Sequence, residues 1–133
     1  MSPEIYWLTL TTLLTPLLIF PYAYNRVSRI TLAVGLRNPL PGDDPFEDEW
    51  AHRAYRAHMN GLENLIIFAP LAIAVAVTGI SNEITQQASA VYFFARLAHA
   101  PFYIIKTPYV RTIVWFIGMA ACFTLGYQLL VVA

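Results

Sequence analysis

The chain has 133 residues, of which 58% are hydrophobic and 12% are charged, and its net charge is zero. Soluble domains average about 25% charged and about 45–50% apolar residues, so this composition excludes an ordinary soluble domain and is typical of a membrane protein. The balanced charge gives no sign of a nucleic-acid-binding surface.

Four long apolar segments predict an all-α integral membrane protein, a bundle of four transmembrane helices that forms one domain over residues 1–133. A helical span needs about 20 predominantly apolar residues. We expect helices over the approximate ranges 5–34, 45–79, 84–106 and 109–132. Prolines within them should kink them locally, and these are Pro16, Pro21, Pro70 and Pro101.

The connection between the first two helices is long, acidic and rich in proline. Within it, Asp44 followed by Pro45 is typical of an N-cap and a first helical residue, and an acidic first turn follows. We therefore predict that the second helix begins near Pro45. The acidic residues could bind a divalent cation, but a solvated loop and helix start is the simpler interpretation, and we predict no metal site.

The basic residues predict the orientation in the membrane. The first connection and its flanks hold Arg26, Arg29, Arg37, Arg53 and Arg56, and the third connection and its flanks hold Lys106 and Arg111. The second connection and both termini hold none. Because basic residues favour the cytoplasmic side, we expect both termini outside and the long first loop and third connection in the cytoplasm.

Polar residues form one stripe on each of the two middle helices. At about 100° per residue, the stripe of the second helix falls within about 120° of the helix circumference. It includes Arg53, Arg56, Asn60 and Glu63, and the stripe of the third helix includes Arg96, His99 and Tyr103. A charge at mid-membrane depth costs about 2.5–3.5 kcal/mol, so such groups normally face a partner, a cavity or a ligand.

Two interpretations of these stripes remain open. They could form an internal ion-pair network that holds the bundle together. We expect Glu63 to contact Arg96 when no ligand is bound, or to share a hydrogen-bond network with it. Arginines outnumber the single deep acid, however, and unpaired buried charge is costly, so an anionic ligand is the other interpretation. Guanidinium groups suit carboxylates in particular.

Three motifs in these segments resemble a known family. The residues from Arg53 to Glu63 match R-x-x-R-A-x-x-N-x-x-E, those from Arg96 to Tyr103 match R-x-x-H-x-x-x-Y, and Arg111-Thr112 resembles an Arg-Ser pair at the start of a fourth helix. The chain thus resembles the MAPEG superfamily, the membrane-associated proteins of eicosanoid and glutathione metabolism. The likeness is to its microsomal glutathione transferases and prostaglandin E synthases.

The resemblance implies a homotrimer that binds glutathione between neighbouring subunits near the cytoplasmic face. Glutathione would be the co-substrate, with no metal, and a lipophilic electrophile would arrive through the membrane lipids. Arg111 and Thr112 would lie beside the thiol as catalytic residues. The residues that would hold the tripeptide are Arg53, Arg56, Asn60, Glu63, Arg96, His99 and Tyr103, with Arg26 or Arg29 from the first helix.

Some positions depart from the eicosanoid-forming members. Met59 replaces a basic residue, Trp115 stands roughly where a tyrosine is found, and Asn64 follows the glutamate in place of a tyrosine. Eicosanoid synthesis is therefore unsupported, and we predict a glutathione-dependent transferase or peroxidase. The alternative is a non-catalytic lipid-binding or regulatory member whose polar stripes are structural. A small channel or transporter subunit is a weaker rival, because the chain has few helices and no repeat.

Overall fold

A break at Leu18 divides the first apolar segment into α1 (Pro3–Leu17) and α2 (Ile19–Arg29). The computed structural model describes residues 1–29, 33, 36, 46 and 48–132. Three longer helices follow: α4 (Glu49–Thr78), α5 (Glu83–Ile104) and α6 (Pro108–Val131). The prediction of an all-helical bundle is confirmed. Most of the predicted extension of the first helix, over 30–34, lies outside the described residues.

The break at Leu18 follows from the chemistry of proline. Pro21 has no N–H to donate to the carbonyl group of Leu17, four residues earlier. The Leu18 N–H instead bonds the carbonyl oxygen of Thr15 at 3.2 Å, three residues earlier, which tightens the chain for one turn. The direction of the helix continues, and residues Pro3–Arg29 together form one apolar stretch of 27 residues.

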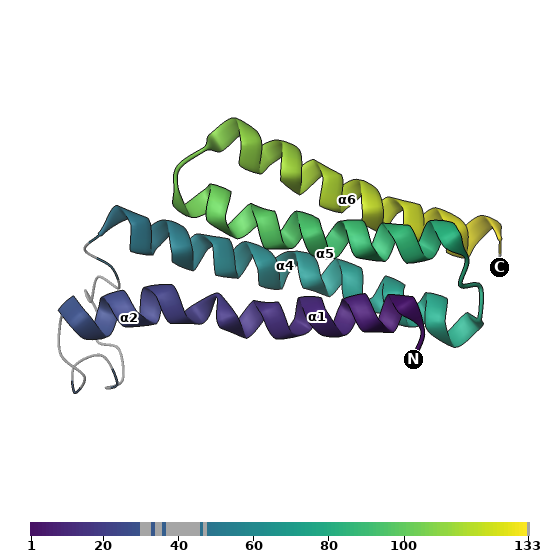
Figure 1. The fold of residues 1–133 in the computed structure, drawn as a ribbon, viewed down its shortest axis with the longest axis horizontal. Coiled ribbons are helices and arrows are strands. Elements are labelled where there is room, and N and C mark those ends of the chain that lie inside the picture. The colour runs from purple at the N-terminus through teal and green to yellow at the C-terminus, as the bar shows by residue number, and fades with distance from the viewer. Residues whose placement is uncertain (30–32, 34–35, 37–45, 47, 133) are drawn as a thin grey trace.

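The helices run alongside one another, and both termini lie at the same end of the bundle (Figure 1). The connection between α4 and α5 is at that end, and the connection between α5 and α6 is at the other end. α1 packs on both α4 and α5, α2 packs on α4, and α6 packs chiefly on α5. The start of α4, which carries Arg53, and the turn after α5, which carries Lys106, therefore lie at the end of the bundle opposite the termini.

The core is an aromatic stack surrounded by small side chains. The rings of Phe68 and Tyr92 lie nearly parallel, with their centroids 4.0 Å apart, and both side chains are fully buried. Alanines at 72, 88 and 121 complete the core, and their small size lets the helices approach one another closely. Cys122 is buried in the same cluster, as a small apolar residue would be.

A buried carboxyl group ties the first helix to the connection between α4 and α5. The side chain of Glu4 is fully buried and accepts hydrogen bonds from the hydroxyl groups of Thr85, at 2.6 Å, and Ser81, at 2.8 Å. In the same region, the Asn82 amide donates to the side-chain oxygen of Gln128 at 2.9 Å, which joins α6 to this end. Polar contacts thus close the end of the bundle that carries the termini.

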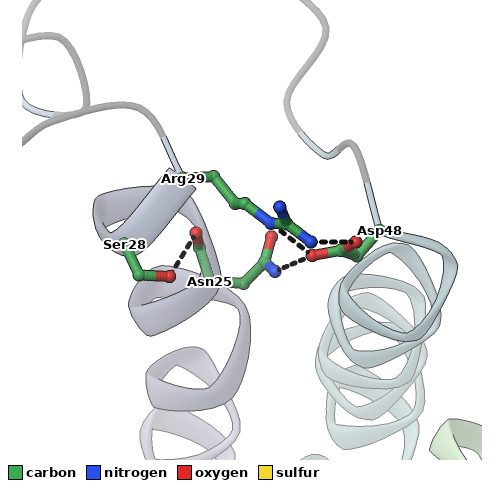
Figure 2. A network of polar contacts seen from close by, with 4 residues as sticks. All are labelled: Asn25, Ser28, Arg29 and Asp48. Carbon is green, nitrogen blue, oxygen red and sulfur yellow. Dashed lines mark hydrogen bonds and ion pairs between the residues drawn. The ribbon is translucent and has the colours of Figure 1, made fainter.

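The second helix was predicted to begin near Pro45, and the structure gives its start as Glu49. The N-cap of α4 is Asp48, and Phe46 is not helical. The Asp48 side chain makes no capping hydrogen bond to the helix, and Figure 2 shows that its carboxylate accepts hydrogen bonds from α2 instead. The Arg29 guanidinium donates two, each 2.8 Å long, and the Asn25 amide donates one of 2.7 Å. The predicted N-cap, Asp44, and Pro45 itself lie outside the described residues.

These hydrogen bonds make stability depend on pH. Donation from Arg29 and then from Asn25 holds the pKa of Asp48 below its ordinary value of 3.8. The stabilisation is therefore complete above the ordinary value and is lost as the pH falls through the lower value of the folded state. We expect the melting temperature of Asp48→Asn to fall less between pH 6 and pH 3 than that of the wild type. Glu49→Gln is the matched control, because it removes the neighbouring acid. That side chain is exposed, and its Oε2 lies 3.7 Å from Arg53 Nη1, farther than the Asp48 contacts. If the melting temperature of Asp48→Asn fell with pH as steeply as that of the wild type, the Asp48 contacts would contribute nothing to the pH dependence of stability.

In the described part of the chain, three helical stretches are long and apolar enough to cross a membrane: Pro3–Arg29, Glu49–Thr78 and Pro108–Val131. Four were predicted, and α5 does not qualify because polar residues lower its mean hydropathy. Glu83 and Gln87, in the first two turns, are exposed, whereas Thr85, Ser89, Arg96 and His99 are buried. Val91, Phe94 and Leu97 are exposed, so the outer surface of α5 is apolar beyond its first two turns.

Candidate functional site

The polar stripe of α4 is divided between two environments. Asn60 and Arg53 are half-buried against the rest of the bundle, whereas Arg56 and Glu63 are exposed. Arg53 is anchored, because its Nε donates to the carbonyl oxygen of Ile104 at 2.8 Å. That bond joins the start of α4 to the last residue of α5 and so fixes the two helices where the stripes meet.

The stripe of α5 faces the bundle interior. Arg96 and His99 are buried, with 6% and 3% of their surface exposed, and Arg96 Nη2 lies 3.3 Å from His99 Nδ1. The rings of His99 and Tyr103, one turn apart, have centroids 5.6 Å apart. The three residues therefore form a continuous series along one face of α5.

The turn after α5 sets the start of α6. Lys106 adopts a positive φ of 64°, a conformation that favours glycine. The Thr107 N–H bonds the carbonyl oxygen of Phe102 and the Lys106 N–H bonds that of Tyr103, which is the Schellman pattern of helix ends. The turn reverses the chain within three residues, so that the first turns of α6 lie beside the last turns of α5.

The first turns of α6 bring a cation onto an aromatic face. The guanidinium carbon of Arg111 lies 4.2 Å from the centroid of the Tyr103 ring. Such a contact is worth about 0.5–1 kcal/mol at exposed sites and more where water is excluded. The Thr112 hydroxyl group donates to the Pro108 carbonyl oxygen at 2.7 Å, so it donates to an anionic ligand only after it turns away from that bond.

A cavity of about 280 Å³ lies where these side chains meet. It is lined by Asn60, His99, Tyr103, Arg111, Thr112 and Trp115. A second cavity of about 300 Å³ shares Tyr103 and Arg111 with the first and adds Arg53, Lys106 and Pro108. No acidic side chain among the described residues lines either cavity, so both suit an anionic ligand.

Comparison with known proteins decides the family. A family model described as "MAPEG family" matches residues 5–131. The chain belongs to the MAPEG family. Similarity is also found to "Microsomal glutathione S-transferase 1" of Mus musculus, with 27% identity over 84 residues. That match covers 62% of this chain and 54% of the mouse protein, so the chain spans about half the length of this curated relative. With its apolar helices, the chain is a multi-pass integral membrane protein.

Several residues that we predicted at the site do not line either cavity of this MAPEG protein. Arg56 and Glu63 are exposed on α4, Arg96 is buried behind His99, and Arg29 pairs with Asp48. Arg26 is half-buried on α2 and also lines neither cavity. The prediction that Glu63 contacts Arg96 was wrong within the protomer: among the described residues, no hydrogen bond or ion pair joins them, and they lie in opposite environments.

Two residues that line the cavities had no assigned role in the sequence interpretation. Trp115 follows Arg111 by four residues, so the two lie on one face of α6, one turn apart. Lys106, in the turn after α5, lines the second cavity. The helical spacing of Trp115 to Arg111 could have identified Trp115, whereas Lys106 is placed by the turn and not by a helix face.

His58 is an aromatic-cluster residue rather than a site residue. Its Nδ1 lies 2.9 Å from the hydroxyl oxygen of Tyr22. The Tyr22 ring packs against the rings of His58, Tyr55 and Phe46 where α2 meets the start of α4. Over the part of the chain that the structure describes, no group of three or more His, Cys, Asp or Glu residues could hold a metal ion.

Proposed function

We propose that this MAPEG protein is a membrane-bound, glutathione-dependent transferase or peroxidase that acts on lipophilic electrophiles. The observation that carries the proposal is the cavity in which Asn60, His99, Tyr103, Arg111 and Thr112 meet, with no acid among the lining residues that the structure describes. Glutathione carries two carboxylates and, once ionised, a thiolate, which such donors bind well. The similarity to a protein named as a glutathione transferase supports the same ligand.

In this proposal, Arg111 and Thr112 act on the sulfur atom. A guanidinium group stabilises a thiolate and lowers the thiol pKa from a free value of about 8.5. The thiol proton goes to solvent, the sulfur forms a bond to the electrophilic carbon or oxygen, and the leaving group departs with the electrons of the broken bond. The chain needs no nucleophile of its own, which agrees with the burial of its single cysteine, Cys122.

We further propose that four helices span the membrane and that three subunits assemble. α5 would be the fourth span, because its buried face is polar and its outer face is apolar beyond the first two turns. Arg56 and Glu63 would lie against a neighbouring subunit, since both are exposed in one protomer although they continue the stripe of Asn60. The site would then be completed across the interface, with Arg26 or Arg29 as the first-helix arginine.

The basic residues support a cytoplasmic location for the cavities. Arg53, Lys106 and Arg111 gather at the end of the bundle opposite both termini. By the preference of basic residues for the cytoplasmic side, the termini would lie outside. Glutathione would then enter from the cytoplasm, and the second substrate from the bilayer.

Titration calorimetry of the detergent-solubilised protein with glutathione tests the proposal. We expect wild-type binding, and we expect Arg56→Ala to weaken it roughly tenfold, since a hydrogen bond to a charged group is worth about 1.5–3 kcal/mol. Glu83→Ala is the control, because Glu83 is exposed at the other end of α5 and should not change the affinity. A wild-type protein that binds no glutathione would overturn the proposed function.

Native mass spectrometry in mild detergent tests the assembly. We expect a trimer for the wild type and partial dissociation for Glu63→Lys, because a second cation in place of an interface acid repels the neighbouring arginines. Glu83→Lys, with the same charge change away from the proposed interface, should remain trimeric. A wild-type monomer at all detergent concentrations would contradict an interface site.

A second candidate function is supported by a different cavity. An apolar groove of about 330 Å³ lies between α5 and α6, toward the termini, and is lined by residues that include Ile84, Val91 and Ile117. Its shape and lining suit an acyl chain, as expected of a lipid-binding or regulatory MAPEG protein. Lipid retained through purification, together with absent glutathione binding, would favour this function over the transferase.

A further inference from the structure

Arg96 is a buried cation that does not line the cavity, although it belongs to the same stripe as the residues that do. Its guanidinium group passes close to the backbone of α4, where a methyl group added at Gly61 would lie 3.7 Å from Nη2. The hydrogen bond that it makes within the described chain is to His99 Nδ1, at 3.3 Å. Arg96 is therefore placed to act on a ligand only through His99.

The direction of this hydrogen bond is fixed by chemistry. A guanidinium group has five N–H donors, no acceptor, and keeps its proton at all physiological pH values. Arg96 must therefore donate, and His99 Nδ1 must accept with its lone pair. An Nδ1 that accepts carries no proton, so the proton of the neutral ring is on Nε2.

The remaining polar atom of His99 is then a donor. Nε2 has no hydrogen-bond partner among the described residues, whereas the His99 side chain lines the cavity together with Tyr103 and Arg111. A second proton on Nδ1 would point at the Arg96 N–H and break the contact. The imidazole ring can thus offer an N–H to a ligand, and it cannot take a proton there.

We infer that Arg96 is a positioning residue: it holds His99 as the Nε2–H tautomer, so that His99 donates a hydrogen bond to an anionic group in the cavity and does not act as a general base. The role in catalysis rests on the proposed function, whereas the tautomer does not. It follows that the thiol proton leaves by way of solvent and not by way of His99.

Nitrogen NMR of protein labelled with ¹⁵N-histidine tests the tautomer without any ligand. The His99 signals are assigned from His52→Gln and His58→Gln variants. We expect the wild type and Arg96→Lys, which both supply a donor, to carry the proton on Nε2, and Arg96→Leu to show a mixture of tautomers. A wild-type proton on Nδ1, or on both nitrogens at neutral pH, would overturn the inference. If Arg96→Leu fails to fold, the wild type and Arg96→Lys alone decide it.

A double-mutant cycle tests the route of action by glutathione affinity. His99→Gln keeps an acceptor and a donor, and should bind within a few fold of wild type, whereas His99→Leu should lose roughly tenfold. Arg96→Leu should weaken binding in the His99 background and add little in the His99→Leu background. Additive losses would mean that Arg96 touches the ligand directly and would contradict a positioning role. Absent glutathione binding in the wild type overturns the proposed function and leaves the tautomer result standing.

Discussion

Replacing Arg111 with alanine should lower the turnover of a generic electrophile by about 10²–10³-fold while glutathione affinity stays within a few fold of wild type. The reason is that the guanidinium group interacts most strongly with sulfur when the sulfur is charged. The carboxylates and the amino group of the tripeptide are held by other residues. Steady-state kinetics and calorimetry on the same preparation separate the two effects.

The neighbouring cation Lys106 supplies the matched control. It lines only the second cavity, so Lys106→Ala should leave turnover near the wild-type value. Arg111→Lys keeps the charge and should recover part of the lost rate. The ultraviolet absorbance of the bound thiolate at neutral pH should be present in the wild type and reduced in Arg111→Ala. Equal losses of affinity and turnover in Arg111→Ala would place Arg111 in ground-state binding instead.

Phe68→Ala should destabilise the protein by about 3–5 kcal/mol. The ring is fully buried and stacks on Tyr92 at 4.0 Å between centroids, so its removal leaves a void between α4 and α5. Thermal or detergent-induced unfolding measures the loss. Ile66→Ala is the control, because Ile66 lies two residues away on the same helix and 73% of its surface is exposed. A loss of equal size in both variants would mean that the stack does not hold the two helices together.

Periodicity predicted the helices well, and it was least informative about where they begin. The acidic residues near Pro45 all favour a helix start, and the N-cap of α4 is Asp48, the last of the aspartates. What decided between them was the position of Arg29 and Asn25 on α2, which no local pattern contains. A single proline, Pro21, divided the first helix at the expected region, because the loss of one N–H is a local effect.

The sequence predicted which candidate site residues share a face of one helix. It did not predict how neighbouring helices are rotated relative to one another. The spacing of His99 and Tyr103 brought both to one cavity, with Arg111 added from α6. The pairing of Glu63 with Arg96 failed because equal depth in two neighbouring helices does not imply facing sides. Rotation of a helix about its axis is set by packing, here by the Phe68–Tyr92 stack and the bond from Arg53 to Ile104.

The attachment of α6 has a consequence for motion. α6 packs chiefly on α5, to a lesser extent on α4, and has no contact with α1 or α2 among the described helices. The contact between α5 and α6 is the most extensive one between two helices of the described bundle. Elements with extensive contacts open last, so α5 and α6 should move as one unit, and the amide hydrogens at their contact should exchange slowly. His99, Tyr103, Arg111, Thr112 and Trp115 lie on that unit, whereas Asn60 lies on α4. Entry of a ligand and its retention would then be governed by one event, a shift of the α5–α6 pair relative to α4.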